Sequence, residues 1–447
     1  MHFTRRRLDR LGSSLFVGVS LLAGAMAASC SSANGSEATP IDDAGADTPA
    51  ATDDASADAP SARDAGVLDA GPLPVVCTSA PCAKALVTTL GAGPDDLGEG
   101  FCALLDDGTV ACWGANGAGQ LGRGDASAAL DSSSPARVIG LSDVVDIDHT
   151  CAVDEHGAVW CWGTGPFLRA DAGGATTTER TPVKLELPPA TKVALGHTTA
   201  CAVADTGLIC WGSNANGQLG PVTEPPDGTG QPRAISIPAG APARALTVGK
   251  ATFVLREDGS LVTWGGNPPI GRISSKFPDS SPRALALDGI GSVDLAYDNA
   301  CATANGTGYC WGARVLPNAG SELDRALPEP IFTPEPLVQI ATTRSHVREV
   351  GGLQRYRWCA IAVSGLVYCW GFNESGQAGD GTQSYAFDPV AVKGLPERAA
   401  QVKTTPNATC ALLVDGKIYC WGSNYNGQLG NGQIRGRSFA PGEVLLP

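Results

Sequence analysis

The chain has few basic residues and few charges of any kind. Only 17% of its 447 residues are charged, and 31 Lys and Arg stand against 45 Asp and Glu, which gives a formal net charge of −14. An acidic chain of this kind lacks the positive surface that binds a nucleic-acid backbone or an anionic membrane. The composition therefore excludes nucleic acid as an expected partner.

Catalytic motifs are also absent from the sequence. The chain has five histidines, and it contains no H-E-x-x-H sequence, no nucleophile elbow and no P-loop. It has no C-x-x-C sequence, and its repeats each offer two thiols where a structural zinc site needs four ligands. We therefore predict no catalytic residue, no metal site and no cofactor, and we interpret the chain as a non-enzyme.

A short motif recurs seven times along the chain. Each copy ends in Trp-Gly, and in six copies two cysteines bracket the motif, as in the first copy, CALLDDGTVACWG over 102–114. The seven tryptophans are Trp113, Trp162, Trp211, Trp264, Trp311, Trp370 and Trp421. A period near fifty residues with one strand-turn-strand motif per copy is typical of a β-propeller with one blade per copy. The sequence predicts an all-β, seven-bladed β-propeller over 77–447.

Each repeat can be divided into four strands joined by short connections. The last strand of every repeat opens with a proline, and short connections favour hairpins between adjacent strands. We expect the C-terminal strand at Pro441–Leu446 to pair with the first strand near Ala85–Leu90. Such a pairing would close the ring and remove the sheet edges at the seam.

The paired cysteines predict cross-strand disulfides. If Cys102 lies opposite Cys112 in a hairpin, then 106–108 form its turn, and directly opposed residues are close enough for a disulfide. The fourth copy has Phe253 and Thr263 at the two cysteine positions, and joint loss is expected of bonded partners. Such bonds require an oxidising compartment. The predicted disulfides are Cys77–Cys82, Cys102–Cys112, Cys151–Cys161, Cys201–Cys210, Cys301–Cys310, Cys359–Cys369 and Cys410–Cys420.

Residues 1–29 have the pattern of an export signal. A basic start precedes an apolar run over 15–28 that is too short and too rich in alanine for a stable membrane span. Ala27-Ala28-Ser29-Cys30 resembles a bacterial lipobox, in which the cysteine is lipidated, but Ala25-Met26-Ala27 could instead be an ordinary cleavage site. Both alternatives stay open on the motif alone. Cys30 is the one cysteine of fifteen left without a local pair, which favours lipidation.

Residues 30–76 are predicted to be a disordered acidic tether. The stretch consists mainly of Ala, Asp, Ser, Thr and Pro, and it carries nine acidic residues against Arg63. So few large apolar side chains cannot bury enough surface to offset the entropy lost on ordering. The expected role of this segment is spacing.

One segment of the sixth repeat is unusually basic. Between Ile340 and Cys359 it carries four arginines, a histidine and two aromatic residues. Propeller function usually resides in loops on one face, and Arg, Tyr and Trp are enriched in binding hot spots. The alternative is a solvated surface loop whose arginines pair with nearby acids such as those at 95–99. The candidate binding residues are Arg344, His346, Arg348, Arg355, Tyr356, Arg357 and Trp358.

The repeat resembles that of the regulator-of-chromosome-condensation family. The likeness rests on the Trp-Gly motif and on a Gly-Gln-Leu-Gly sequence that follows Asn116, Asn214 and Asn424, with a slightly altered form after Asn373. It implies a seven-bladed propeller. The founding member of the family is a nuclear guanine-nucleotide exchange factor, and we do not expect that activity of an exported chain with an acidic tether. We place the chain in the bacterial exported lipoprotein branch of the family; the bacterial branch also includes a secreted β-lactamase inhibitor.

These observations predict a monomeric, lipid-anchored propeller that acts as a non-catalytic binding module at the bacterial cell envelope. Its expected partner is a protein or a glycan, and it contacts the membrane only through its anchor. The first alternative is a secreted enzyme inhibitor of the β-lactamase-inhibitor type, which should show a belt of aromatic residues around one channel mouth. The second is a carbohydrate hydrolase, which should show converging carboxylates there.

Overall fold

The computed structural model describes residues 71–93, 96, 98–124, 130–168, 175–221, 230–315, 322–343 and 356–447. Within these ranges, 28 strands form seven four-stranded antiparallel sheets, and the strands of each sheet are neighbours in both sequence and space. The predicted all-β, seven-bladed propeller is confirmed. The predicted signal peptide and the tether up to residue 70 lie outside the described residues.

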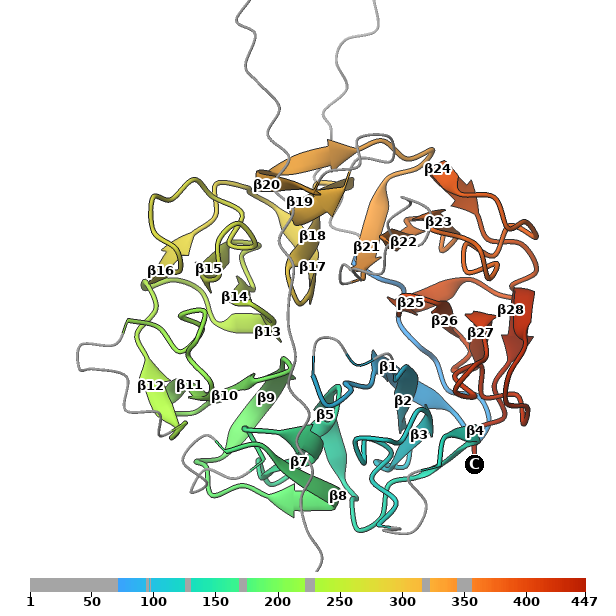
Figure 1. Cartoon of the computed structure of the whole chain (residues 1–447), viewed down its shortest axis with the longest axis horizontal. Helices are drawn as coiled ribbons and strands as arrows, with labels where there is room; N and C mark the ends of the chain where they lie inside the picture. The colour runs from blue at the N-terminus through green and yellow to red at the C-terminus, as the bar shows by residue number, and fades with distance from the viewer. Residues whose placement is uncertain are drawn as a thin grey trace, which may run out of the picture. The chain divides into compact units, whose positions relative to one another are not determined.

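The strands hold equivalent places in every blade, with the first strand next to the channel and the fourth at the rim (Figure 1). The first strands are β1 (Ala83–Thr88), β5 (Val144–Asp148), β9 (Ala190–Leu195), β13 (Ala243–Val248), β17 (Ile290–Ala296), β21 (Leu337–Thr342) and β25 (Ala399–Thr404). The second strands are β2 (Gly100–Leu105), β6 (Cys151–Asp154), β10 (Thr199–Ala204), β14 (Ala251–Arg256), β18 (Asn299–Ala304), β22 (Arg357–Ala362) and β26 (Ala408–Leu413). The third strands are β3 (Val110–Gly114), β7 (Val159–Gly165), β11 (Gly207–Gly212), β15 (Leu261–Gly265), β19 (Thr307–Val315), β23 (Val367–Gly371) and β27 (Ile418–Ser423). The fourth strands are β4 (Ser132–Arg137), β8 (Thr177–Lys184), β12 (Arg233–Ile235), β16 (Asp279–Ala284), β20 (Glu322–Ile331), β24 (Ala386–Ala391) and β28 (Arg437–Glu443).

The blades form a closed ring, but the ring does not close by strand pairing as the sequence analysis expected. Each first strand contacts the first strand of the next blade, and β25 contacts β1 across the seam. Within the sheets β28 pairs with β27 and β1 pairs with β2, so the predicted pairing of the two ends of the chain is wrong. Every blade is already complete with four consecutive strands, and the seam closes by packing and by contacts such as the 2.8 Å hydrogen bond from Leu86 N–H to Gln401 Oε1.

The repeated tryptophans join successive blades. Six of them are fully buried, and each donates its indole N–H to a backbone carbonyl in a loop of the preceding blade. The pairs are Trp113 with Gln428 (3.0 Å), Trp162 with Gln120 (2.9 Å), Trp211 with Phe167 (2.9 Å), Trp264 with Gln218 (2.7 Å), Trp311 with Pro269 (2.6 Å) and Trp421 with Gln377 (2.9 Å). Four acceptors are the glutamine of the Gly-Gln-Leu-Gly sequence or its Gly-Gln-Ala-Gly variant. The sequence motif therefore positions a carbonyl for the tryptophan of the following blade.

The turns between the second and third strands link the blades at the opposite end of the channel. Gly108 has a φ of 77°, which glycine adopts without strain, and its carbonyl accepts the N–H of Val144 in the next blade at 2.9 Å. Equivalent bonds join Gly157 to Ala190, Gly259 to Ile290, Gly306 to Leu337, Gly365 to Ala399 and Gly416 to Ala83. These turns define one face of the ring, the second-turn face, and their aspartates serve the turn, as the sequence indicated.

The predicted disulfides are confirmed. In six blades the two cysteines are directly opposed in the hairpin of the second and third strands, with Cα atoms 4.0 to 4.1 Å apart. In the blade without cysteines, Phe253 on β14 is opposite Thr263 on β15 in the same register. Cys77 and Cys82 form the seventh bond.

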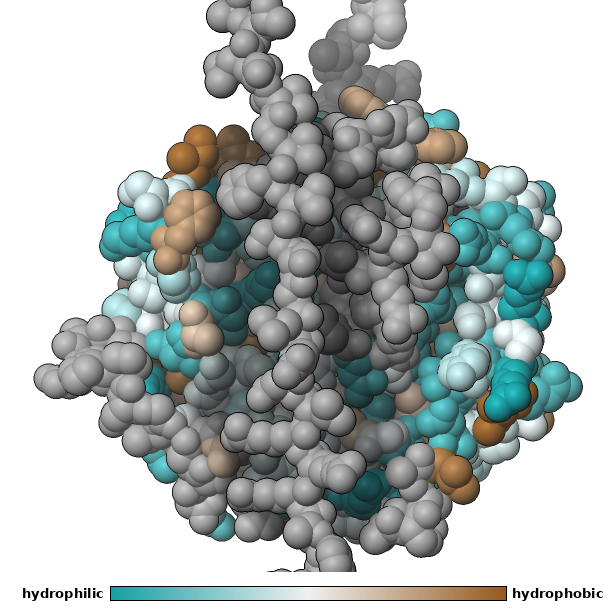
Figure 2. Space-filling view, in the orientation of Figure 1, coloured by the Kyte–Doolittle hydropathy of each residue, from teal (hydrophilic) through white to brown (hydrophobic). Residues whose placement is uncertain are grey.

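The chain enters the propeller on the second-turn face. Val76 donates its N–H to the carbonyl of Val414, which lies in the turn between β26 and β27, at 2.8 Å. Val75 packs against the core cluster that blades one and seven share. The Cys77–Cys82 bond then closes a short loop before β1 begins. Figure 2 shows hydrophobic residues scattered among hydrophilic ones over the rim of the described propeller.

Candidate binding site at the channel mouth

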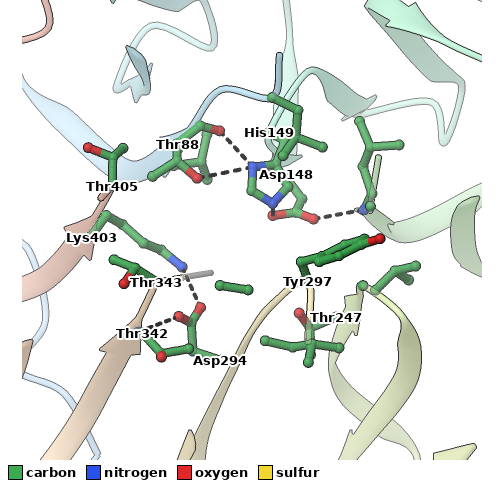
Figure 3. A pocket seen from close by; sticks show the side chains of 18 of the residues that line it. Thr88, Asp148, His149, Thr247, Asp294, Tyr297, Thr342, Thr343, Lys403 and Thr405 are labelled. Carbon is green, nitrogen blue, oxygen red and sulfur yellow. Dashed lines mark hydrogen bonds and ion pairs between the residues drawn. The ribbon is translucent and has the colours of Figure 1, made fainter. Parts of the chain in front are cut away.

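The C-terminal ends of the seven first strands converge on the other end of the channel. There they enclose a cavity of about 280 Å³ that is lined by residues from all seven blades (Figure 3). We call this end of the channel the mouth. Loops at one end of a rigid sheet can change their side chains without disturbing the sheet, so binding residues are commonly found in such places.

Seven residues occupy equivalent positions around the mouth. Each is paired in register with the first cysteine of its blade, or with Phe253 in blade four. We call these residues the mouth ring, and they are Val87, Asp148, Ala194, Thr247, Asp294, Ala341 and Lys403. Four of them are small or apolar, and the other three are charged.

The charged members of the mouth ring contact one another and the neighbouring blades. Lys403 Nζ lies 3.4 Å from Asp294 Oδ1, and Asp294 Oδ2 accepts the N–H of Thr342 at 2.8 Å. Asp148 Oδ2 accepts the N–H of Leu195 at 2.8 Å. Burial lowers the pKa of Lys403, but the carboxylates of Asp294 and Asp148 more than offset this, so its pKa is raised. Lys403 is therefore a charged ammonium held between two carboxylates.

Polar and aromatic side chains surround this ring at the rim of the mouth. His149 Nδ1 lies 2.8 Å from the carbonyl oxygen of Thr88. Lys250 Nζ lies 3.4 Å from Asp298 and 4.5 Å from the centre of the Tyr297 ring. His197 meets the same tyrosine ring edge-on, with centroids 5.7 Å apart. The rim thus offers an aromatic wall on the side of blades three to five.

Acidic side chains also brace the channel below the ring. Asp146 Oδ2 accepts the N–H of Val193 at 2.9 Å, and its Oδ1 lies 3.8 Å from Lys192 Nζ. Burial raises the pKa of Asp146 to about 6, although the Val193 hydrogen bond and Lys192 act in the opposite direction. Like Asp148, this carboxylate binds the exposed edge of the first strand of blade three.

The predicted binding segment is only partly described. Arg344, His346, Arg348 and Arg355 lie outside the described residues, and their proposed role in binding stays a prediction. Tyr356, Arg357 and Trp358 are described, and their exposed fractions are 1%, 1% and 6%. These three residues do not lie on a solvated loop. Arg357 and Trp358 begin β22, Tyr356 directly precedes it, and all three side chains are buried.

Arg357 connects blade six to blade seven. Its guanidinium donates to the backbone carbonyls of Thr405 and Ala408 at 2.8 Å each and to that of Gln377 at 2.9 Å. Burial lowers the pKa of Arg357 to about 9, and the negative charge of Glu99 opposes this shift. The side chain therefore stays charged, and it joins a carbonyl of blade six to two carbonyls of blade seven.

Glu99 holds the same turn of blade seven from the side of blade one. Its carboxylate accepts the hydroxyl of Thr405 at 2.6 Å and the side-chain N–H of Asn407 at 2.7 Å. Burial raises the pKa of Glu99, while these two hydrogen bonds and the charge of Arg357 lower it. Arg357 and Glu99 thus bind the same turn of blade seven from two sides.

Tyr356 and Trp358 belong to the packing of blade six. The Trp358 ring lies 6.2 Å from that of Tyr356 and 6.0 Å from that of Trp370, in near-parallel arrangements. Both side chains join the core cluster that blade six shares with its neighbours. From residue type alone we predicted that these aromatic residues belong to a binding hot spot. In the structure they lie at the start of a buried strand and pack in the core.

Sequence analysis missed the residues that line the mouth. Asp148, Asp294 and Lys403 stand at a position where the other repeats carry small or apolar residues, and that contrast is visible only once the repeats are aligned on the cysteines. Tyr297 and Lys250 lie in turns of different repeats, and no linear motif connects them. Among the described residues, no group of His, Cys, Asp and Glu could hold a metal ion, and no helix is long and apolar enough to cross a membrane.

Comparisons with known proteins identify the type of repeat. A model of the regulator of chromosome condensation (RCC1) repeat matches residues 107–153, 364–412 and 415–446, and a second model of this repeat matches 400–428. These parts of the chain contain repeats of that type.

The chain is similar to curated proteins over most of its length. It is 28% identical to the ultraviolet-B receptor UVR8 of Arabidopsis thaliana over 387 residues. The aligned region covers 81% of this chain and 82% of the receptor. It is 28% identical to the human E3 ubiquitin-protein ligase HERC2 over 367 residues. This aligned region covers 78% of this chain but 7% of the ligase. The mouse regulator of chromosome condensation is 26% identical over 367 residues, with 73% and 83% covered.

Solved structures share the fold. Human WBSCR16 superposes with a TM-score of 0.62 at 18% identity, over 76% of this chain and 95% of that protein. Prp20p of Saccharomyces cerevisiae, described together with its binding to Gsp1p and histones, superposes with a TM-score of 0.55 at 22% identity, over 71% and 79% of the two chains. At these identities the likeness establishes the propeller fold.

Replacing Arg357 tests its structural role. We expect Arg357→Met to lower the free energy of unfolding by about 3–5 kcal/mol, because the hydrogen bonds between blades six and seven are lost and the buried charge of Glu99 loses the opposite charge of Arg357. Arg357→Lys should not restore stability, because an ammonium cannot reproduce the fork of donors. The control is Arg137→Met, since Arg137 forms an exposed ion pair with Asp107 and its loss should cost less than about 1 kcal/mol. Urea denaturation gives all three values, and equal stability of Arg357→Met and Arg137→Met would contradict the assignment.

Proposed function

We propose that this chain is a non-catalytic binding module that recognises a protein or glycan partner through the mouth of its propeller. The observation that carries the proposal is one cavity, lined by described residues of all seven blades, with an aromatic wall and a ring of mixed charge. Three charged residues at ring positions are not needed to build a blade, since four blades have small or apolar residues there. Residues that the repeat does not require are the ones free to serve recognition.

Similar proteins support a binding role. UVR8 is a receptor, and Prp20p binds Gsp1p and histones. A protein partner is therefore the first expectation for this chain as well. The ligase activity of HERC2 is not proposed here, because this chain spans 7% of that protein. Guanine-nucleotide exchange is not proposed either, because seven disulfides favour an oxidising compartment outside the cytosol.

We place the protein at the bacterial cell envelope, exported and anchored through a lipid on Cys30. The disulfides use fourteen of the fifteen cysteines and leave Cys30 for lipidation. The chain enters the propeller on the second-turn face, so a tether attached there would leave the mouth accessible to a partner. The acidic composition of 30–76 suits a spacer that keeps the domain away from an anionic surface.

The two alternatives have less support. An inhibitor was expected to carry a belt of aromatic residues, and the described mouth has aromatic side chains mainly on one side, at His197 and Tyr297. A hydrolase was expected to carry converging carboxylates. Asp148 and Asp294 do face the cavity, but each binds the backbone of the next blade and Asp294 is paired with Lys403. Carboxylates engaged in these bonds are better placed to attract a charged partner than to transfer a proton or attack a substrate.

Blocking the mouth tests the proposed function. Thr247 belongs to the mouth ring and lines the cavity, and Thr247→Phe should fill it. Immobilised wild-type protein should retain a specific component of an envelope extract, and Thr247→Phe should lose it while keeping its melting temperature within a few degrees. The matched control is Thr176→Phe, which places the same ring on an exposed residue just before β8. Retention of the same component by Thr247→Phe would show that the binding face lies elsewhere.

Removing Cys30 tests the anchor. Cys30→Ala should move the protein from the membrane fraction to the soluble fraction, because a lipid chain contributes about 0.8 kcal/mol per buried CH₂ group to membrane binding. Fractionation and the mass of the mature N-terminus provide the measurement. A wild-type protein that is soluble and starts at Ala28 would show ordinary signal cleavage instead.

A further inference from the structure

We propose that the mouth takes up a lysine side chain of the partner, with its ammonium against Asp148. This inference rests on the proposed binding function and names the chemical group that the mouth recognises. The mouth ring carries two carboxylates, Asp148 and Asp294, and one ammonium, Lys403. The two carboxylates outnumber the one ammonium, which lies 3.4 Å from Asp294, so the ring keeps an excess negative charge that can balance a further cation. Asp148 Oδ1 lies 3.9 Å from His149 Nε2, which is longer than a hydrogen bond, so this oxygen can accept one from a ligand.

An ammonium carries three hydrogen-bond donors, and carboxylate oxygens are suitable acceptors for them. Thr89 and Thr342 also line the cavity, but their Oγ1 atoms are buried away from it. The carboxylate of Asp148 is therefore the acceptor on which the proposal depends.

The walls of the cavity suit the hydrocarbon stem of a long side chain. Leu195, Val248 and Leu295 line it together with Tyr297. Its volume of about 280 Å³ is at or below the lower end of the range of roughly 300–1,000 Å³ for small-molecule pockets. A single extended side chain therefore fits this space better than a cofactor or an oligosaccharide. Lysine buries its stem along apolar surface while its charged end stays with polar groups.

The arrangement of the carboxylate oxygens favours lysine over arginine. Asp148 Oδ2 already accepts the N–H of Leu195, and both oxygens of Asp294 are bonded, to Thr342 and Lys403. Neither carboxylate can present two unoccupied oxygens to the planar fork of a guanidinium. A compact ammonium needs only one carboxylate oxygen and can take its other acceptors from separate groups.

The test uses the full chain and a fluorescein-labelled Gly-Gly-Lys-Gly-Gly peptide with blocked termini, followed by fluorescence anisotropy. Peptides with arginine, norleucine or glutamate in place of lysine are the comparisons. The lysine peptide should bind saturably and more tightly than the other three. Asp148→Asn should weaken its binding by about tenfold or more, since a charge-assisted hydrogen bond is lost. The amide oxygen of Asn can still accept the N–H of Leu195, so the fold should be kept, which the melting temperature checks.

A control variant with the same change in net charge separates specific binding at the mouth from general electrostatic attraction between the peptide and the acidic domain. Asp388 lies exposed on β24, and Asp388→Asn changes the net charge by the same amount away from the mouth. It should leave binding of the lysine peptide unchanged. Equal binding by Asp148→Asn and the wild type, equal loss in Asp388→Asn, or tighter binding of the norleucine or arginine peptide would each overturn the proposal.

The outcome for the partner distinguishes this proposal from the proposed function. If Thr247→Phe loses the retained envelope component while Asp148→Asn retains it, the mouth is the binding face but does not recognise a lysine through Asp148. If Thr247→Phe still retains that component, the mouth is not the binding face. Loss of the component in both variants, with retention by Asp388→Asn, supports both proposals.

Discussion

The hydrogen bond from a tryptophan indole to a carbonyl of the preceding blade is the interaction on which the ring depends. Six fully buried tryptophans make this bond, and each brings a large ring into the space between two sheets. A buried indole N–H without an acceptor would be costly, so the bond fixes the distance and the angle between blades. Because the same bond recurs at six of the seven junctions between blades, the first strands of all seven blades meet around one channel.

The other contacts between blades reinforce this arrangement at different heights. On the second-turn face, glycine carbonyls such as that of Gly108 accept an N–H from the next first strand. Along the channel, Asp146 and Asp148 bind the free strand edge of blade three. At the mouth, Arg357 and Glu99 hold one turn of blade seven from two sides. Charged residues inside this ring thus serve structure first, and Asp148 is the one to which we also assign recognition.

The sequence predicted the features that all repeats share. It did not predict the features that depend on residues found in single repeats. The Trp-Gly motif and the paired cysteines gave the blade number and the hairpin register, and the joint change at Phe253 and Thr263 proved to be one opposed pair. Ring closure was predicted wrongly, because short connections do not reveal whether blade one is complete without β28. The mouth was not foreseen, because its residues come from seven separate repeats. The burial of Arg357 was not foreseen either, because composition does not tell a charged residue that starts a strand from one on a loop.

Hydrogen exchange of the indole N–H groups tests the central claim most directly. Trp160 provides an internal reference, because it is only partly buried and donates to Asp154 of its own blade at 2.9 Å. If the bonds between blades hold the ring, the indole N–H groups of the six joining tryptophans should exchange only when the whole domain unfolds, at one common slow rate, and that of Trp160 should exchange faster. Exchange of any of the six as fast as that of Trp160, under conditions where the domain stays folded, would contradict the account.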